Sequence, residues 1–254
     1  MSWSAVDLSI LLPAFAAGLL VLATHVPLGA QVLRKGIVFI DLAIAQIAGL
    51  GVIVAGMLGF ESAGWQVQIA AATAACLGAL LLTWTEARWP EVQEAQIGAL
   101  FVLAATAGIL LLAKNPHGGE HLRDLLAGQI LWVGYRQLVV PLLVTTLTLA
   151  LLWGLRERLS RVGFYLVFAL AVTASVQLVG VYLVFATLIV PALGARQWST
   201  RQRLAVAYGV GVAGYGSGLV LSAALDLPTG ALIVWCLAVL AGVAHWLAPA
   251  TPAR

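Results

Sequence analysis

The chain has 254 residues, of which 62% are hydrophobic and only 9% are charged, and its mean hydropathy is +1.04. Soluble domains carry about one quarter charged residues, so no soluble fold of this length could bury so much apolar surface. The net charge of +3 comes from basic residues scattered over the connections, which gives no sign of a nucleic-acid-binding surface. Composition therefore predicts an all-α polytopic membrane protein.

Apolar segments long enough to cross a bilayer follow one another along the whole chain. A membrane helix needs about 20 apolar residues. No basic residue precedes Arg34, so we expect the first segment to be a retained span rather than a secretory signal. We predict one transmembrane domain over 1–254 with eight or nine spans. The predicted spans are 8–30, 37–58, 67–84, 95–113, 136–154, 163–179, 181–195, 204–224 and 228–247.

The apolar stretch 163–195 is too long for one untilted span and short for two full spans. Gly180 and Pro191 are the residues in it that can break a helix. A single helix would place one of the flanking arginine-rich connections, 155–161 or 196–203, on the outer side. Because basic residues favour the cytoplasmic side, we predict a broken helix pair with its break near Gly180.

One carboxylate lies within the second predicted span, in "VFIDLAIAQIAGLG". A charge at the bilayer centre costs roughly 2.5–3.5 kcal/mol on insertion scales. Asp41 lies early in this span and His25 lies late in the first, so antiparallel packing could bring these two together. Gln46, the third candidate, is five residues after Asp41 and does not share one narrow helix face with it. Imidazole and carboxylate groups bind zinc and manganese. The alternative is that Asp41 is hydrogen-bonded at a helix end and that His25 packs at an interface.

A second group of ligand-type residues lies in the outer segment "KNPHGGEHLRDLLAGQILW". His117, Glu120 and His121 surround a pair of glycines. If this segment is helical, His117 and His121 lie on one face. The segment could capture an incoming cation, or it could be a solvated connection whose charges mark the membrane surface.

Two further features of the sequence are a pair of acidic residues and a motif that the chain does not contain. Glu91 and Glu94 precede the fourth predicted span, where acidic residues favour the helix dipole. The chain contains no G-x-x-x-x-G-K-[ST] phosphate loop, so we do not expect it to hydrolyse ATP in that way.

Five segments together resemble the metal-ion permease family of ABC importers, which carry zinc, manganese or iron through bacterial inner membranes. The segments are "VLRKGIVFIDLAIAQIAGLG", "EAQIGALF", "DLLAGQILW", "VQLVGVYLVFATLIVPALGAR" and "LDLPTGALIV". The resemblance implies an all-helical permease that works with a separate ATP-binding subunit and an extracytoplasmic metal-binding protein. It also implies two permease copies, or two related permeases, around one pathway, and of these we expect a homodimer.

Two departures from the family pattern bear on the site. Family members commonly carry D-x-x-x-H in the second span, whereas Ala45 stands four residues after Asp41 here. We therefore hypothesise that His25 replaces the missing ligand. The connection after the fifth span is also short, so coupling to the ATPase would rest on "LRERLSRVG" and the next arginine-bearing connection. The expected coupling residues are Arg156, Arg158, Arg161 and Arg196.

We therefore expect a multi-pass permease of the bacterial cytoplasmic (inner) membrane. Its cargo would be a divalent transition-metal ion, zinc first and manganese second. We expect no covalent catalysis and no permanently bound cofactor. The alternative is a secondary transporter driven by an ion gradient, with Asp41 as the coupling carboxylate.

Overall fold

The computed structural model describes residues 8–60, 64–113, 118–154 and 160–249. Within these ranges it contains ten α-helices and no strand, which confirms the all-α class. The helices are α1 (Leu8–Lys35), α2 (Ile40–Met57), α3 (Trp65–Arg88), α4 (Gln93–Leu112), α5 (Gly118–Ala127), α6 (Val139–Gly154), α7 (Arg161–Val179), α8 (Val181–Gly194), α9 (Thr200–Leu225) and α10 (Thr229–Trp246). Among the described residues, eight segments are long and apolar enough to cross a membrane, and α8 is a shorter apolar helix.

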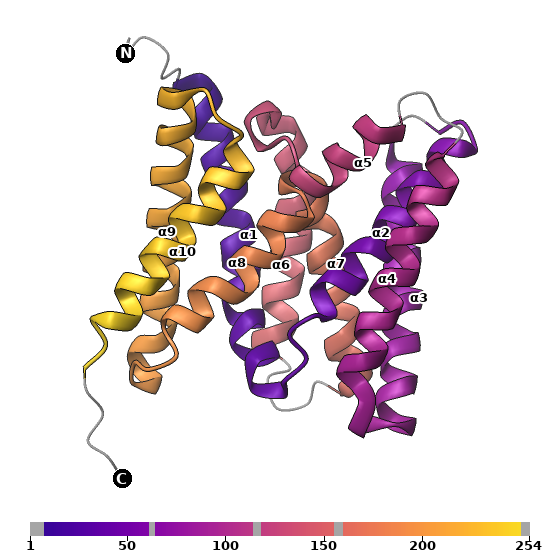
Figure 1. Cartoon of the computed structure of the whole chain (residues 1–254), viewed down its shortest axis with the longest axis horizontal. Coiled ribbons are helices and arrows are strands. Elements are labelled where there is room, and N and C mark those ends of the chain that lie inside the picture. Colours follow the sequence, from indigo (N-terminus) through magenta and orange to yellow (C-terminus); the bar gives the residue numbers. More distant parts are fainter. Residues whose placement is uncertain (1–7, 61–63, 114–117, 155–159, 250–254) are drawn as a thin grey trace.

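The helix ends gather at two opposite faces of the molecule (Figure 1). The C-terminal ends of α1 and α3 lie at the lower edge of the figure, as do the starts of α7 and α9. These ends carry Lys35, Arg88, Arg161 and Arg203. Because basic residues accumulate on the inner side of a membrane, we expect the lower face to be the cytoplasmic one.

The predicted break between the sixth and seventh spans is confirmed at Gly180. Its backbone has φ 82° and ψ 162°, a conformation that favours glycine, and it separates α7 from α8. Gly128, with φ 68°, lies directly against it at the end of α5. A Cβ on Gly180 would meet the Gly128 backbone and lie 2.7 Å from the carbonyl carbon of Ala127. The short helix α5, which lay outside the predicted spans, therefore docks on the break.

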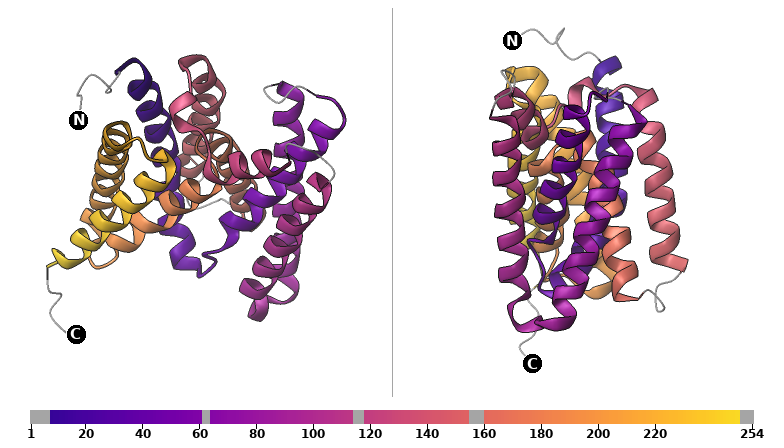
Figure 2. Two further views of the ribbon diagram at one scale, coloured as in Figure 1. Left: turned by 45° about the horizontal axis from the view of Figure 1, so that its top comes forward. Right: turned by 90° about the vertical axis from the view of Figure 1, so that its right-hand side faces the viewer.

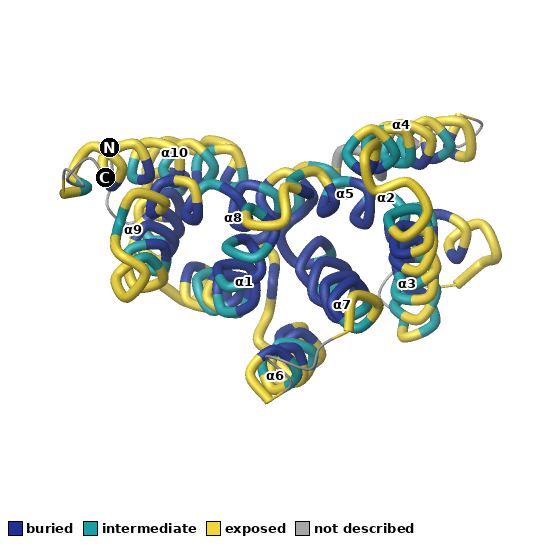
Figure 3. Tube along the Cα trace, turned by 90° about the horizontal axis from the view of Figure 1, so that it is seen from below, coloured by how far each residue is buried: buried dark blue, intermediate teal, exposed yellow. Residues whose placement is uncertain are grey.

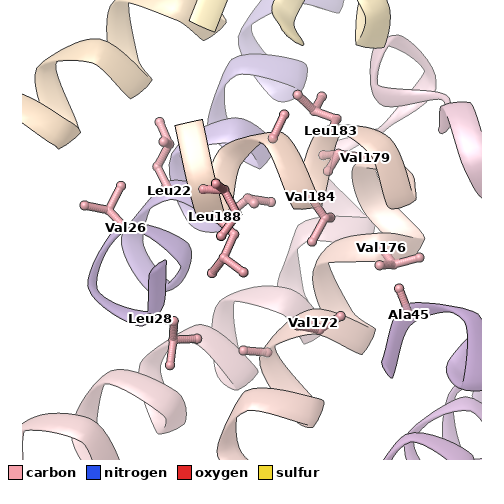
Figure 4. Packing of buried hydrophobic residues seen from close by; sticks show 14 of the residues in the cluster. Leu22, Val26, Leu28, Ala45, Val172, Val176, Val179, Leu183, Val184 and Leu188 are labelled. Atoms are coloured by element: carbon pink, nitrogen blue, oxygen red, sulfur yellow. The ribbon is translucent and has the colours of Figure 1, made fainter. Parts of the chain in front are cut away.

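Helices α1, α7 and α8 form the buried centre (Figure 3), while α6 packs at the edge of the bundle with most of its surface exposed (Figures 2 and 3). Helix α8 packs against α1 and α10, and α7 packs against α3 and α2. Leu22 and Val26 of α1 face Leu188 of α8 (Figure 4). The carbonyl of Leu188 approaches Gly29 so closely that no Cβ would fit there. Small residues thus let the central backbones approach closely, as is common in membrane bundles.

Candidate functional site

Asp41 lies in the first turn of α2, and only 1% of its surface is exposed. Neither carboxylate oxygen has a hydrogen-bond partner. Phe39 precedes the helix, and no side chain caps the helix start. The interpretation of Asp41 as a hydrogen-bonded helix cap is therefore wrong in this structure. The helix dipole favours a negative charge at this position but does not replace the lost solvation.

His25 lies inside α1 with none of its surface exposed. Its Nδ1 is 3.0 Å from the carbonyl oxygen of Val21 and 3.0 Å from the hydroxyl of Thr24. Its Nε2 has no partner. When Nδ1–H donates to a backbone carbonyl, the lone pair of Nε2 is left to bind a cation, and metal-binding histidines are commonly oriented in this way.

Asp41 and His25 are not in contact in this structure. No ion pair or hydrogen bond joins these two described residues, and α7 and α8 lie between their helices (Figure 3). The described part of the chain holds no group of three or more His, Cys, Asp or Glu residues able to bind a metal ion. Shared cation binding by Asp41 and His25 stays a prediction.

Gln46, one turn beyond Asp41 on α2, borders a cavity of about 10 Å³, room for roughly one water molecule. Gly49 of α2, Gly108 of α4 and Val176 of α7 form other parts of the wall. Leu125 of α5 also lines it. The structure therefore places Gln46 beside a small space under α5, between the helices of the bundle.

The outer group predicted from the sequence falls largely beyond the described residues. His117 lies outside them. Glu120 and His121 belong to α5, but their side chains are not among those described. The helical conformation that would put His117 and His121 on one face begins at Gly118. A role in cation capture stays a prediction.

The two arginine-bearing connections differ in the described structure. Arg156 and Arg158 lie outside the described residues. Arg161, at the start of α7, has its Nε 3.8 Å from a carboxylate oxygen of Glu86. Arg196 is exposed in the connection between α8 and α9.

The connection around Arg196 is docked on the end of α10. Gln197 Nε2 lies 3.2 Å from His245 Nε2, and the indole N–H of Trp198 donates to the carbonyl of Ala244 at 2.9 Å. Arg203 donates to the carbonyl of Trp198 at 3.3 Å. These bonds give residues 195–199 a defined shape at the cytoplasmic face.

Glu94 makes a contact that the sequence analysis missed. Its Oε1 accepts a hydrogen bond of 2.8 Å from the backbone N–H of Val38, just before α2. The acidic residue was expected to favour the dipole of its own helix, and it does lie in the first turn of α4. Only the presence of Glu94 in "EAQIGALF", one of the five family-like segments, could have drawn attention to it.

Comparison with known proteins connects this architecture to a family. The family model described as "ABC 3 transport family" matches residues 7–160 and 149–248. An uncharacterized membrane protein of Synechocystis sp. is 28% identical over 177 residues, which are 61% of this chain and 63% of that protein. The chain thus spans less than two thirds of the length of this relative.

Two solved structures share the fold. PsaBC from Streptococcus pneumoniae, solved in complex with a Fab, matches with a TM-score of 0.75 and 20% identity, over 95% of this chain and 91% of that one. An ABC transporter of metal-chelate type in an inward-facing conformation matches with a TM-score of 0.69 and 17% identity, over 92% and 85% of the two chains. Since the family model covers nearly all the described helices, this protein belongs to the ABC 3 transport family and is a multi-pass membrane component of an ABC transporter.

Proposed function

We propose that the chain is the permease subunit of an ATP-driven importer of divalent transition-metal ions, with zinc as first cargo and manganese as second. It would act in the bacterial cytoplasmic membrane as one of two permease copies. A separate cytoplasmic subunit would hydrolyse ATP, and an extracytoplasmic protein would deliver the metal. The observation that carries the proposal is the buried, unpartnered carboxylate of Asp41 in a member of an ABC transport family.

A transported dication would supply the positively charged partner that the buried carboxylate of Asp41 lacks. A buried carboxylate without partners is strongly unfavourable, and apolar walls cannot compensate its charge. The attraction between a carboxylate and a dication is large at short range and grows as the local dielectric constant falls. A site with few ligands binds weakly enough to release its ion, which transport requires.

His25 and Gln46 are the further candidate ligands. The Nε2 of His25 carries a free lone pair when Nδ1 bonds Val21, and imidazole suits zinc better than manganese. His25→Ala should therefore lower zinc uptake more than manganese uptake. The same ratio measured for Leu19→Ala, at an exposed side chain of the same helix, provides the control.

For the ATPase contact, we favour the connection 195–199 with Arg196 over the connection that holds Arg156 and Arg158. Gln197 and Trp198 attach the connection 195–199 to the end of α10 by hydrogen bonds. A movement of the ATP-binding subunit against this connection would therefore be transmitted to α8, α9 and α10 together. Arg161 is partly engaged by Glu86 and is less available to a partner.

The outer segment would receive the metal from the binding protein. We propose that His117, Glu120 and His121 form this contact at the start of α5. Replacing His117 and His121 with alanine should weaken uptake at low metal concentration and leave it unchanged at saturation.

The decisive experiment is the uptake of radioactive zinc and manganese into vesicles that contain the permease and its ATP-binding subunit. Asp41→Asn keeps the size of the side chain and removes its charge, so uptake should fall at least tenfold. Asp226→Asn is the matched control, because Asp226 is exposed at the end of α9 with φ 53°, which asparagine tolerates well. Unchanged uptake in Asp41→Asn would refute the pathway role. Uptake that persists without the ATP-binding subunit and follows an ion gradient would instead support a secondary transporter.

A further inference from the structure

The connection that leads into α2 is tied to another helix. Residues 36–39 turn the chain from α1 into α2, with Gly36 at φ 72° and the side chain of Ile37 buried. The N–H of Val38 donates to Glu94 of α4 at 2.8 Å. Val38 lies one residue before Phe39, the N-cap of α2, so the bond to Glu94 anchors the connection that leads into this uncapped helix.

The helix that carries Glu94 is itself held in place. The neighbouring Gln93 is buried and donates to the hydroxyl of Tyr165 and to the carbonyl of Leu82, both at 3.3 Å. Arg161, which is one turn before Tyr165 on α7, has its Nε 3.8 Å from a carboxylate oxygen of Glu86 on α3. The cytoplasmic ends of α3, α4 and α7 therefore form one linked unit, to which the start of α2 is attached through Glu94.

We propose that Glu94 is a positioning residue for Asp41. Val38 precedes Asp41 by three residues, so the bond that Val38 donates to Glu94 fixes the entry into α2 and with it the place of the carboxylate. This inference rests on the proposed metal-binding role of Asp41. It differs from a role in the helix dipole, because a dipole role needs the charge of Glu94 whereas the bond to Val38 needs only an acceptor oxygen.

The experiment compares Glu94→Ala, which removes the acceptor, with Glu94→Gln, which keeps an acceptor oxygen and removes the charge. Glu91→Ala is the matched control, because Glu91 is an exposed carboxylate in the short turn before α4. Initial rates of zinc uptake over a range of concentrations separate KM from the maximal rate. Glu94→Ala should raise KM roughly threefold to tenfold, as expected for the loss of one ordinary hydrogen bond, with little change in maximal rate per folded transporter. Glu94→Gln and Glu91→Ala should stay close to the original protein.

Hydrogen exchange gives a second readout that does not depend on transport. The peptide covering residues 36–42 should exchange faster in Glu94→Ala and at the original rate in Glu94→Gln. A general loss of stability would instead speed exchange throughout the bundle and lower the maximal rate at constant KM, which would overturn the inference.

Two other results would also overturn it. The first is a KM for Glu94→Gln equal to that of Glu94→Ala, which would make charge the important property. The second is unchanged exchange of residues 36–42 in Glu94→Ala. Failure of the proposed function is recognised separately, because Asp41→Asn would then transport normally whatever the Glu94 variants do.

Discussion

Two regions of this bundle differ in whether their buried polar groups have hydrogen-bond partners. On the side formed by α8, α9 and α10, buried hydroxyls are paired: Thr187 and Tyr215 lie 2.8 Å apart, and Ser222 and Thr229 lie 2.6 Å apart. At the start of α2, both oxygens of Asp41 are buried without partners. We name these the paired region and the open region.

This difference suggests that the two regions serve different purposes, the first stability of the fold and the second the proposed transport. Paired hydroxyls between membrane helices contribute modestly to stability, about 0.6 kcal/mol each on average. An unpaired buried carboxylate costs stability and persists where function requires it. The comparison teaches that the paired region holds the helices together, whereas the open region has unfilled binding capacity that a cation would fill.

The largest expected effect, on the yield of folded protein, comes from a change at Gly180, between the two regions. Gly180 links α7, which packs on the open region, to α8 of the paired region. In Gly180→Ala, the new Cβ would meet the backbone of Gly128 and Ala127, and the left-handed φ of 82° would add strain. We expect little folded protein, measured by size-exclusion chromatography after detergent extraction.

The matched control for this change is Gly209→Ala in α9, where nothing lies within 4 Å of the added Cβ. It should accumulate normally. Equal yields for the two variants would contradict the close approach of α5 to the helix break.

A second test concerns the proposed coupling between the paired region and the ATP-binding subunit. Trp198→Ala removes the hydrogen bond to Ala244, so the connection 195–199 should loosen from α10. We expect metal uptake to fall severalfold while ATP hydrolysis by the partner subunit continues, measured in the same vesicles. Trp246→Ala, which removes a side chain that is 83% exposed nearby on α10, should leave the ratio of uptake to hydrolysis unchanged.

In the open region, stability and transport should change in opposite directions. Asp41→Asn should lower uptake at least tenfold and yet raise the melting temperature in metal-free detergent, because it removes a buried carboxylate that has no partner. A gain of one kcal/mol corresponds to about 2–4 °C for a chain of this size. A lower melting temperature would mean that Asp41 stabilises the fold, which would remove the contrast between the regions. Asp226→Asn should shift neither property.

The smallest effect is expected in the paired region. Tyr215→Phe keeps the ring that packs on Gly18 and removes only the hydroxyl bonded to Thr187. The free energy of unfolding should fall by roughly 0.5–1.5 kcal/mol, with uptake unchanged. Tyr182→Phe, at a side chain that is 57% exposed, should have no effect on either measurement. Loss of uptake in Tyr215→Phe would place transport chemistry in the paired region.

Much of the candidate site could be anticipated from single residues. Asp41 was identifiable because a carboxylate in an apolar span is expensive wherever the span packs. The hydrogen bond of Glu94 could not be identified from the sequence, because its partner Val38 lies 56 residues away along the chain and carries no sequence signal of its own. The contact between Gly128 and Gly180 was missed for a similar reason, since a glycine pattern does not reveal which backbone approaches it.

By itself the sequence determined the class of protein, its spans and the break at Gly180. These follow from local properties, namely hydropathy over about 20 residues, the placement of basic residues and the conformational freedom of glycine. Only the tertiary structure decided that α5 docks on the break, that Asp41 lacks partners while Thr187 and Tyr215 have them, and that Glu94 holds the start of α2. Those features depend on which helices become neighbours, and in a membrane that choice rests on close packing and hydrogen bonds between distant segments, which hydropathy does not encode.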